Sequence, residues 1–471
     1  MESRTQLSKF TFIGMTCALV MSVRNIPDLA ASGWTMLSML LIAVVLYAIP
    51  ISMISGEYAG MFPGAEGGIE GWNTNALGPK WGNATSWLTW VQMFPGMVMI
   101  SSALAPLFAI VLNKPELGEN NIFTFAVILI VYWTVTLLNF KFDMAKFGGQ
   151  IGVWLGVYIP MIMMLGLGIA ATIKTGLNPD SVLGAFDAKK LVPDTSDESA
   201  LKYLAPIMFI FTGIEMSAVH VNRLKDPVKD YISGLFIALI AMFGLNLLNG
   251  FIVANTIPNG KMELNNISQP IEFYCKILGI SPYLVNVFSI MVILGVIVQL
   301  SAWSVGPSMT IVSSARRGVY PPKLNFWKTN KHGISTAVVL TQAVVISIFA
   351  CMYILIPGVN EAFLTLVTAT TVLYSIAYII MAVGIIKLRK EKPDLARPFK
   401  IGSDGMAKFV AILLIVVIIA SVAVTLSSSK LIDIVAILVI VGILFATPFI
   451  IYSKMKPEWK EEVEAELAKE K

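Results

Sequence analysis

The amino-acid sequence predicts an all-α integral membrane protein with 12 transmembrane helices. Three observations lead to this prediction. Of the 471 residues, 56% are hydrophobic and only 13% are charged, and the mean hydropathy is +0.77, whereas soluble domains carry roughly 25% charged residues. Twelve apolar stretches are each long enough to cross the hydrocarbon core of a bilayer. Lysine and arginine gather between alternate stretches, as in polytopic membrane proteins.

The apolar stretches follow one another from residue 10 to residue 453. The first begins after the polar segment 1–9 and lacks a small-residue cleavage site, so we expect a retained helix rather than a signal peptide. The predicted spans are 10–31, 34–55, 82–112, 122–140, 150–173, 203–222, 232–256, 284–313, 334–356, 361–386, 409–429 and 431–453.

The positions of lysine and arginine predict the orientation of the chain. With both termini in the cytoplasm, the cytoplasmic segments would hold 25 of the 34 Lys and Arg residues and the external segments eight, as the positive-inside rule requires. We therefore expect a multi-pass protein of the cell (plasma) membrane, and we interpret the basic clusters after spans eight and ten as topology signals. The expected parts are a cytoplasmic N-terminus 1–9, a ten-span core 10–386, a cytoplasmic loop 387–408, two further spans 409–453 and a short cytoplasmic tail 454–471.

Two predicted spans are interrupted near their middle. The first contains Arg24, Pro27 and Asp28, and the sixth contains Gly213 and Glu215. Intramembrane charges and freed backbone groups are tolerated where they are buried or line a cavity. Interruptions at matching points of two five-helix halves, 10–173 and 203–386, are typical of an inverted-repeat transporter with a site at the midplane. Ordinary packing kinks, or an Arg24–Asp28 or Arg24–Glu215 ion pair that only holds helices together, are the alternatives.

Other classes of protein find little support in the sequence. Its two histidines and the lack of an intramembrane carboxylate dyad or nucleophile–base pair argue against an enzyme, so we expect no catalytic residue, metal or cofactor. No phosphate-binding glycine loop indicates an ATP-driven pump, and no repeated filter segment indicates a channel. No basic and aromatic stripe indicates a nucleic-acid partner. The three cysteines, which we expect to serve in packing, are Cys17, Cys275 and Cys351.

Several segments of the chain carry motifs of a known family. They are residues 66–69 with 72–82 after span two, 213–222 with 226–231 in and after span six, 294–308 in span eight, and 21–33 in span one. Together they resemble the amino acid/polyamine/organocation (APC) superfamily of permeases, and within it the glutamate/GABA antiporter branch. The resemblance covers nearly the whole chain. It implies a leucine-transporter-type fold, in which spans one to five (10–173) and six to ten (203–386) form a 5+5 inverted repeat, plus two C-terminal helices.

The resemblance also implies a set of substrate contacts at the two interruptions. The unwound backbone of the first span would bind the α-carboxylate, and carbonyl groups of the sixth would accept from the amino group, as helix-end dipoles favour. By position, the carboxylate-binding residues are Met21, Ser22 and Val23, and the amine-binding residues are Thr212, Gly213 and Ile214.

Three further positions take their expected roles from the same resemblance. Trp303 falls where the related arginine/agmatine antiporter has a substrate-contacting tryptophan, and Phe209 falls where that protein has its gating tryptophan. Glu215 matches an acid that is widespread in the superfamily, with a role in gating or helix packing rather than direct ligation.

The sequence departs from the glutamate/GABA branch at two positions of the expected site. Gln299 stands where that branch has a glutamate, and Arg24-Asn25 replace aromatic and acidic residues. The loss of an acid and the gain of a cation disfavour a cationic substrate, and a guanidinium can pair with a side-chain carboxylate. We therefore expect an acidic or neutral amino acid, with glutamate as the leading candidate.

These observations predict a secondary active amino acid antiporter that works by alternating access. It would exchange a glutamate-like amino acid for a related amino acid or amine such as GABA, with the lipid bilayer and small-molecule substrates as its partners. The alternatives are an ion-coupled symporter, for which Ser301, Ser304 and Ser308 could supply hydroxyls, or an exchanger for another amino acid or a polyamine. His220 is either a pH-sensing residue or, as for most single histidines, a packing or capping residue.

Overall fold

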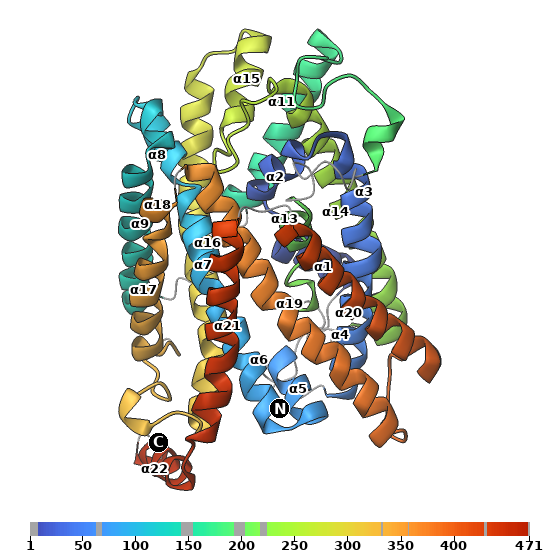
Figure 1. Cartoon of the computed structure of the whole chain (residues 1–471), viewed down its shortest axis with the longest axis vertical. Helices are drawn as coiled ribbons and strands as arrows, with labels where there is room; N and C mark the ends of the chain where they lie inside the picture. The colour runs from blue at the N-terminus through green and yellow to red at the C-terminus, as the bar shows by residue number, and fades with distance from the viewer. Residues whose placement is uncertain are drawn as a thin grey trace.

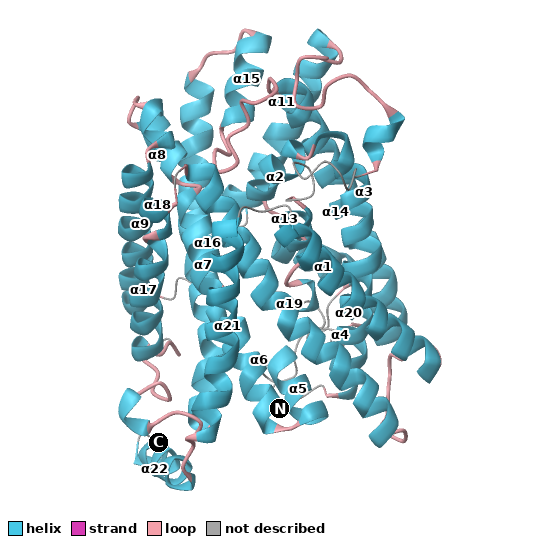
Figure 2. Ribbon diagram, in the orientation of Figure 1, coloured by secondary structure: helices cyan, strands magenta, loops and turns pink. Residues whose placement is uncertain are grey.

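Long helices make up almost all of the protein, as the computed structural model shows (Figures 1 and 2). The structure describes residues 8–62, 68–142, 154–192, 203–216, 224–330, 333–356, 358–427 and 431–469. Within these ranges no β-strand is present, and an isolated β-bridge joins Ser181 and Pro258. His220 and His332 lie outside the described residues.

Nine helical segments of the described chain are long and apolar enough to span a membrane, or ten if the bent pair Ile437–Ser453 and Pro457–Lys469 counts as one. Each of the nine overlaps one predicted span. The all-helical membrane architecture is therefore confirmed, whereas the count of twelve spans and the internal repeat stay predictions. The nine segments are Gly33–Met61, Pro79–Val111, Asn121–Lys141, Trp154–Thr175, Lys229–Thr256, Tyr283–Arg316, Thr336–Leu355, Val359–Glu391 and Asp404–Ser427.

The predicted third span is a run of three short helices rather than one. Prolines explain its bends, because each lacks a backbone N–H and constrains the residue before it. Pro79 and Pro106 lie in the first turns of α6 and α8, and Pro95 lies in the first turn of α7. The helices are α6 (Pro79–Val91), α7 (Met93–Ser102) and α8 (Ala105–Val111).

The other helices between residues 33 and 191 largely follow the predicted spans. The second span contains a π-helical turn, η3, and a separate helix, α5, follows it. The elements are η2 (Gly33–Thr35), α3 (Met36–Ile42), η3 (Ala43–Ala48), α4 (Ile49–Met61), α5 (Ile69–Leu77), η4 (Pro115–Glu119), α9 (Asn121–Lys141), η6 (Trp154–Tyr158), α11 (Ile159–Thr175) and η7 (Ala188–Leu191).

The second half of the chain contains the longest helices, α16 and α19. The elements of this half are α14 (Pro227–Thr256), α15 (Gln269–Leu278), α16 (Tyr283–Arg316), η9 (Pro322–Leu324), α17 (Thr336–Ala350), α18 (Met352–Leu355), α19 (Val359–Glu391), α20 (Asp404–Ser427), α21 (Leu431–Ser453) and α22 (Pro457–Lys469).

The central helices are the third and tenth spans. The most apolar window is 83% buried in the α6–α8 run and 78% buried in α19, against 39% in α9, α11 and α20. A helix surrounded by protein can carry polar side chains on several faces, whereas a lipid-facing helix cannot. A polar functional site is therefore expected beside α7 and α19.

The first span is broken where the sequence predicted an interruption. Helix α1 (Lys9–Val20) ends before Met21, a short 3-10 turn η1 (Val23–Asn25) follows, and α2 (Ile26–Ala31) continues the span. Pro27 lies in the first turn of α2, where its missing N–H is tolerated. The hydroxyl of Ser22 accepts a hydrogen bond from the backbone N–H of Arg24 at 3.3 Å and so caps η1.

The sixth span is broken as well. Helix α13 (Leu204–Phe209) is followed by turns at 210–213 and a short 3-10 turn at 214–216. Gly213 has a φ of +95°, a backbone conformation that side chains with a Cβ rarely adopt. Gly213 is therefore the residue that allows the chain to turn at this point.

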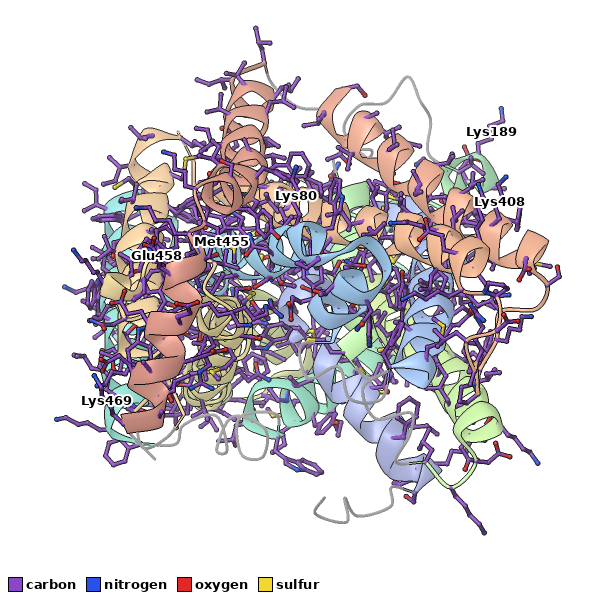
Figure 3. The ribbon with its side chains drawn as sticks, turned by 90° about the horizontal axis from the view of Figure 1, so that it is seen from below. Lys80, Lys189, Lys408, Met455, Glu458 and Lys469 are labelled. Atoms are coloured by element: carbon purple, nitrogen blue, oxygen red, sulfur yellow. The ribbon has the colours of Figure 1, made fainter. Side chains whose placement is uncertain are left out.

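The molecule has two distinct ends. Helix α22 lies at one end and α15 at the other (Figure 1), and Figure 3 views the α22 end, with Lys80, Met455 and Glu458 labelled. There α22 packs on the turn that follows α16, where a Cβ on Gly318 would lie 2.8 Å from the backbone nitrogen of Lys460. The C-terminal tail therefore contains a helix, and this helix packs against the rest of the protein.

A buried charge cluster joins α4, α19 and the loop before α20. Glu57 is fully buried and accepts two hydrogen bonds of 2.6 Å from Arg389, one of 3.2 Å from Arg397 and one of 2.8 Å from the N–H of Ile401. Arg389 also donates to Asp404 at 2.6 Å. The sequence interpretation assigned these two arginines to topology alone, and it missed this cluster because nothing local identifies Glu57 as their partner.

We expect Arg389→Met to lower the free energy of unfolding by about 3–5 kcal/mol, because the buried Glu57 carboxylate loses its bidentate partner. SDS titration of the purified protein in mixed micelles measures this loss. Lys387→Met is the matched control, since its pair with Glu391 is about half exposed, and exposed pairs contribute about 0–1 kcal/mol. Equal losses in the two variants would contradict a stabilising role for the buried cluster.

Candidate functional site

One cavity lies between the two broken spans and the central helices. It holds about 690 Å³ of empty space, its opening to solvent included. Its walls come from the first and sixth breaks, from α7 and the preceding Gln92, and from α16 and α19. The lining residues are Met21, Ser22, Arg24, Asn25, Gln92, Met93, Gly96, Ile100, Phe209, Thr212, Gly213, Gln299, Trp303, Thr370 and Tyr374.

The structure brings most of the sequence-predicted site residues together around this cavity. Val23, Ile214 and Glu215 do not line it; they are 0%, 0% and 2% exposed and pack inside the protein. The eight predicted residues in the wall are Met21, Ser22, Arg24, Phe209, Thr212, Gly213, Gln299 and Trp303.

Sequence reasoning missed the part of the wall that comes from the third and tenth spans. A signal was present in both. Gln92 is a polar residue in the middle of an apolar span, close to the bend between α6 and α7. In α19, threonines at 368, 370 and 371 precede Tyr374. The missed residues are Gln92, Met93, Gly96, Ile100, Thr370 and Tyr374.

The break in the first span presents two kinds of backbone group to the cavity. Helix α1 ends at Val20 with its carbonyl end, and η1 and α2 begin after Ser22 with their amide end. Helix carbonyl ends favour cations and amide ends favour anions. A zwitterion placed across this break would therefore meet complementary partial charges at both of its groups.

Arg24 gives the cavity its positive charge. Its Nη1 is buried and has no hydrogen-bond partner, and the part of the chain that the structure describes contains no ion pair between Arg24 and either Asp28 or Glu215. Neither of the ion pairs considered as alternatives, Arg24–Asp28 or Arg24–Glu215, is therefore present in the structure. A guanidinium nitrogen that is buried without a partner is unfavourable, so this wall of the cavity is complementary to a carboxylate.

Glu215 holds the sixth break against α19. Its carboxylate accepts hydrogen bonds from the hydroxyls of Tyr374, at 2.6 Å, and Tyr378. The hydroxyl of Tyr378 in turn accepts a 2.8 Å hydrogen bond from the N–H of Gly213, and Tyr47 and Thr212 share one of 3.1 Å between their hydroxyls. Glu215 therefore positions two cavity residues, Gly213 and Tyr374, from behind the wall.

A second polar network supports the opposite wall. Gln342 of α17 accepts a 2.8 Å hydrogen bond from the indole of Trp90 and donates to the hydroxyls of Tyr132 and Ser304. Tyr132 and Ser304 also share a hydrogen bond of 3.0 Å. The network joins α6, α9, α16 and α17 next to Trp303. Because all its members are paired, we expect this wall to be rigid.

The chemistry of the site is that of binding. The described residues contain no group of three or more His, Cys, Asp or Glu side chains placed to hold a metal ion. The cavity offers one cation, amide side chains, hydroxyls and aromatic faces. Such a wall can orient a small polar molecule.

Comparison with known proteins gives consistent matches. The family model described as "Amino acid permease" matches residues 7–453. An uncharacterized transporter of Legionella pneumophila is 28% identical over 412 residues, which is 86% of each chain. A glutamate/gamma-aminobutyrate antiporter of Lactococcus lactis is 27% identical, over 86% of this chain and 80% of its own. A probable agmatine/putrescine antiporter of Lactococcus lactis is 24% identical, over 89% and 88%.

We expect Tyr378→Phe to lower the free energy of unfolding by about 1–3 kcal/mol, because Gly213 and Glu215 each lose a buried partner. Tyr320→Phe is the matched control, since the Tyr320 hydroxyl is also buried but has no hydrogen-bond partner among the described residues. Its removal should leave stability unchanged or slightly raised. SDS titration measures both variants, and an equal effect would argue against the Glu215 arrangement.

Proposed function

The chain belongs to the amino acid permease family, and from this premise we propose that it exchanges an acidic, glutamate-like amino acid for a related amino acid or amine such as GABA. As a member of this family it is a membrane transporter. The finer assignment of substrate and coupling is the proposal. Alternating access of the cavity to the two sides of the membrane would carry the substrate across.

The unpaired guanidinium of Arg24 is the observation that carries the choice of substrate. The α-amino and α-carboxylate groups of any amino acid could occupy the break of the first span. Only an acidic side chain brings a second carboxylate, which would supply the anion that Nη1 of Arg24 lacks. Hydrogen bonds between a guanidinium and a carboxylate are charge-assisted and are about twice as strong as neutral ones.

The remaining expected contacts fit the same orientation. Met21, Ser22 and the buried Val23 would offer backbone groups to the α-carboxylate, and Thr212, Gly213 and Ile214 would offer carbonyls to the amino group. The aromatic residues Phe209 and Trp303, both in the cavity wall, would cover the substrate, and Gln299 would donate or accept at its edge. Glu215 would act as a positioning residue through Tyr374 and Gly213.

Exchange rather than ion-coupled symport is supported by the names of two relatives. Both Lactococcus lactis proteins described above are called antiporters. Of the three serines that could have supplied sodium ligands, Ser304 is bound to Tyr132 and Gln342, and Ser308 donates to the carbonyl of Val305. The hydroxyl of Ser301 is buried and has no hydrogen-bond partner among the described residues. Sodium-driven symport is the competing assignment, and the uptake experiment distinguishes it.

Uptake of radiolabelled glutamate into liposomes that contain the purified protein tests the proposal. We expect saturable uptake when GABA or glutamate is inside the liposomes and little uptake when only buffer is inside. The reason is that an exchanger changes the side to which its cavity opens only when a substrate is bound. Uptake into empty vesicles that requires a sodium gradient would overturn exchange, and the absence of glutamate uptake under every condition would overturn the substrate.

We expect Arg24→Gln to raise the KM for glutamate by roughly 10- to 150-fold, which corresponds to the loss of about 1.5–3 kcal/mol of charge-assisted hydrogen bonding. Its KM for glutamine should change little, because glutamine has no side-chain carboxylate. Arg24→Lys should recover part of the glutamate affinity because it keeps the charge. Competition assays with both amino acids measure this preference, with the exposed Lys114→Gln as control. An unchanged substrate range in Arg24→Gln would refute the role of Arg24.

A further inference from the structure

Asp28 of α2 is a buried acid that the proposed binding mode does not use. Its side chain is 4% exposed, its Oδ1 has no hydrogen-bond partner, and no basic group of the described chain forms an ion pair with it. A buried carboxylate in this state is strongly unfavourable while it is ionised.

Helix α14, which packs against the first span, carries further unpartnered oxygens. Helix α14 runs along the first span, with Tyr231 against Phe12 at one end. Near the other end, a Cβ on Gly250 would lie 2.9 Å from the Leu29 side chain, next to Asp28. Asn246 lies one turn before Gly250 on the same face of α14, and Asn249 directly precedes it.

Both asparagines have an unpartnered oxygen. Each donates one amide hydrogen to a carbonyl of its own helix, Asn246 to Met242 at 2.8 Å and Asn249 to Leu245 at 2.9 Å. Their Oδ1 atoms are buried and unpartnered. Asp28 on α2 and the two asparagines on α14 therefore have three buried oxygens without a partner among the described residues.

Few charged or titratable groups face this interface. Arg24 lies four residues before Asp28, Tyr203 next to α13 is close enough for its charge to interact with that of Asp28, and α14 has no ionisable residue after Tyr231. A bound proton converts the Asp28 carboxylate into a carboxylic acid, whose O–H can itself donate a hydrogen bond. One proton thus removes the buried charge.

We propose that Asp28 is a proton-binding site and that its proton is bound together with the acidic substrate. An ionised Asp28 would compete with the substrate carboxylate for Arg24, which lies on the same broken span. A protonated Asp28 leaves the guanidinium to the substrate. Asp28 takes one proton from water for each anionic substrate that binds at Arg24. The net charge of the site therefore does not change when the substrate binds. This inference rests on the proposed acidic substrate.

The pH dependence of glutamate counterflow tests the inference. The wild-type KM for glutamate should rise by about tenfold per pH unit once Asp28 loses its proton, whereas Asp28→Asn, which mimics the protonated form, should have a nearly flat profile. Asp180→Asn makes the same chemical change in an exposed external loop and should keep the wild-type profile. A wild-type slope in Asp28→Asn overturns the inference, and so does relief of the high-pH loss by sodium.

Thermal unfolding in detergent provides a second measurement that needs no substrate. As pH rises, the wild-type protein should lose stability relative to Asp28→Asn, because ionisation places an unpaired charge between α2 and α14. Parallel stability profiles of the two proteins would overturn proton binding at Asp28. If glutamate is not transported, the proposed function fails, while this measurement still decides whether Asp28 binds a proton.

Discussion

The rest of the structure depends on one constraint, which is that every backbone polar group inside a membrane needs a partner within the protein or in a cavity. Most of the chain meets it with uninterrupted helices. The first and sixth spans break this rule, and each break is stabilised by particular residues. Ser22 caps the turn that follows α1, and the hydroxyl of Tyr378 accepts from the N–H of Gly213. Because both breaks adjoin one cavity, the places where the helices are interrupted are also where the candidate site lies.

The buried charges of the protein fall into two groups with different meanings. Glu57 and Arg389 satisfy one another through two short hydrogen bonds, and Glu215 accepts from two tyrosines. These groups stabilise the packing of α4, α19 and the sixth break. Arg24 and Asp28, by contrast, lie on the same broken span with unpartnered atoms and without pairing with each other. An unsatisfied buried charge is retained when function requires it, so these two residues carry the proposals.

The walls of the cavity differ in how they are supported. Gln342 ties α6, α9, α16 and α17 together through a fully paired network, so the wall that bears Trp303 is rigid. The sixth break is held against α19 by the hydrogen bonds of Gly213 and Glu215 with Tyr374 and Tyr378.

The sequence by itself determined the membrane class, the all-helical architecture and the two points at which helices break. Those features are local, because hydropathy, proline, glycine and isolated charges act on the segment that contains them. The resemblance added the family, which the match over residues 7–453 confirms. Only the tertiary structure decided which groups are partnered. Glu57 and Arg389 are 332 residues apart, Glu215 and Tyr378 are 163 apart, and the contributions of Gln92 and Thr370 to the cavity depend on how central helices pack. Pairing between distant segments is set by packing in three dimensions, which no local pattern encodes.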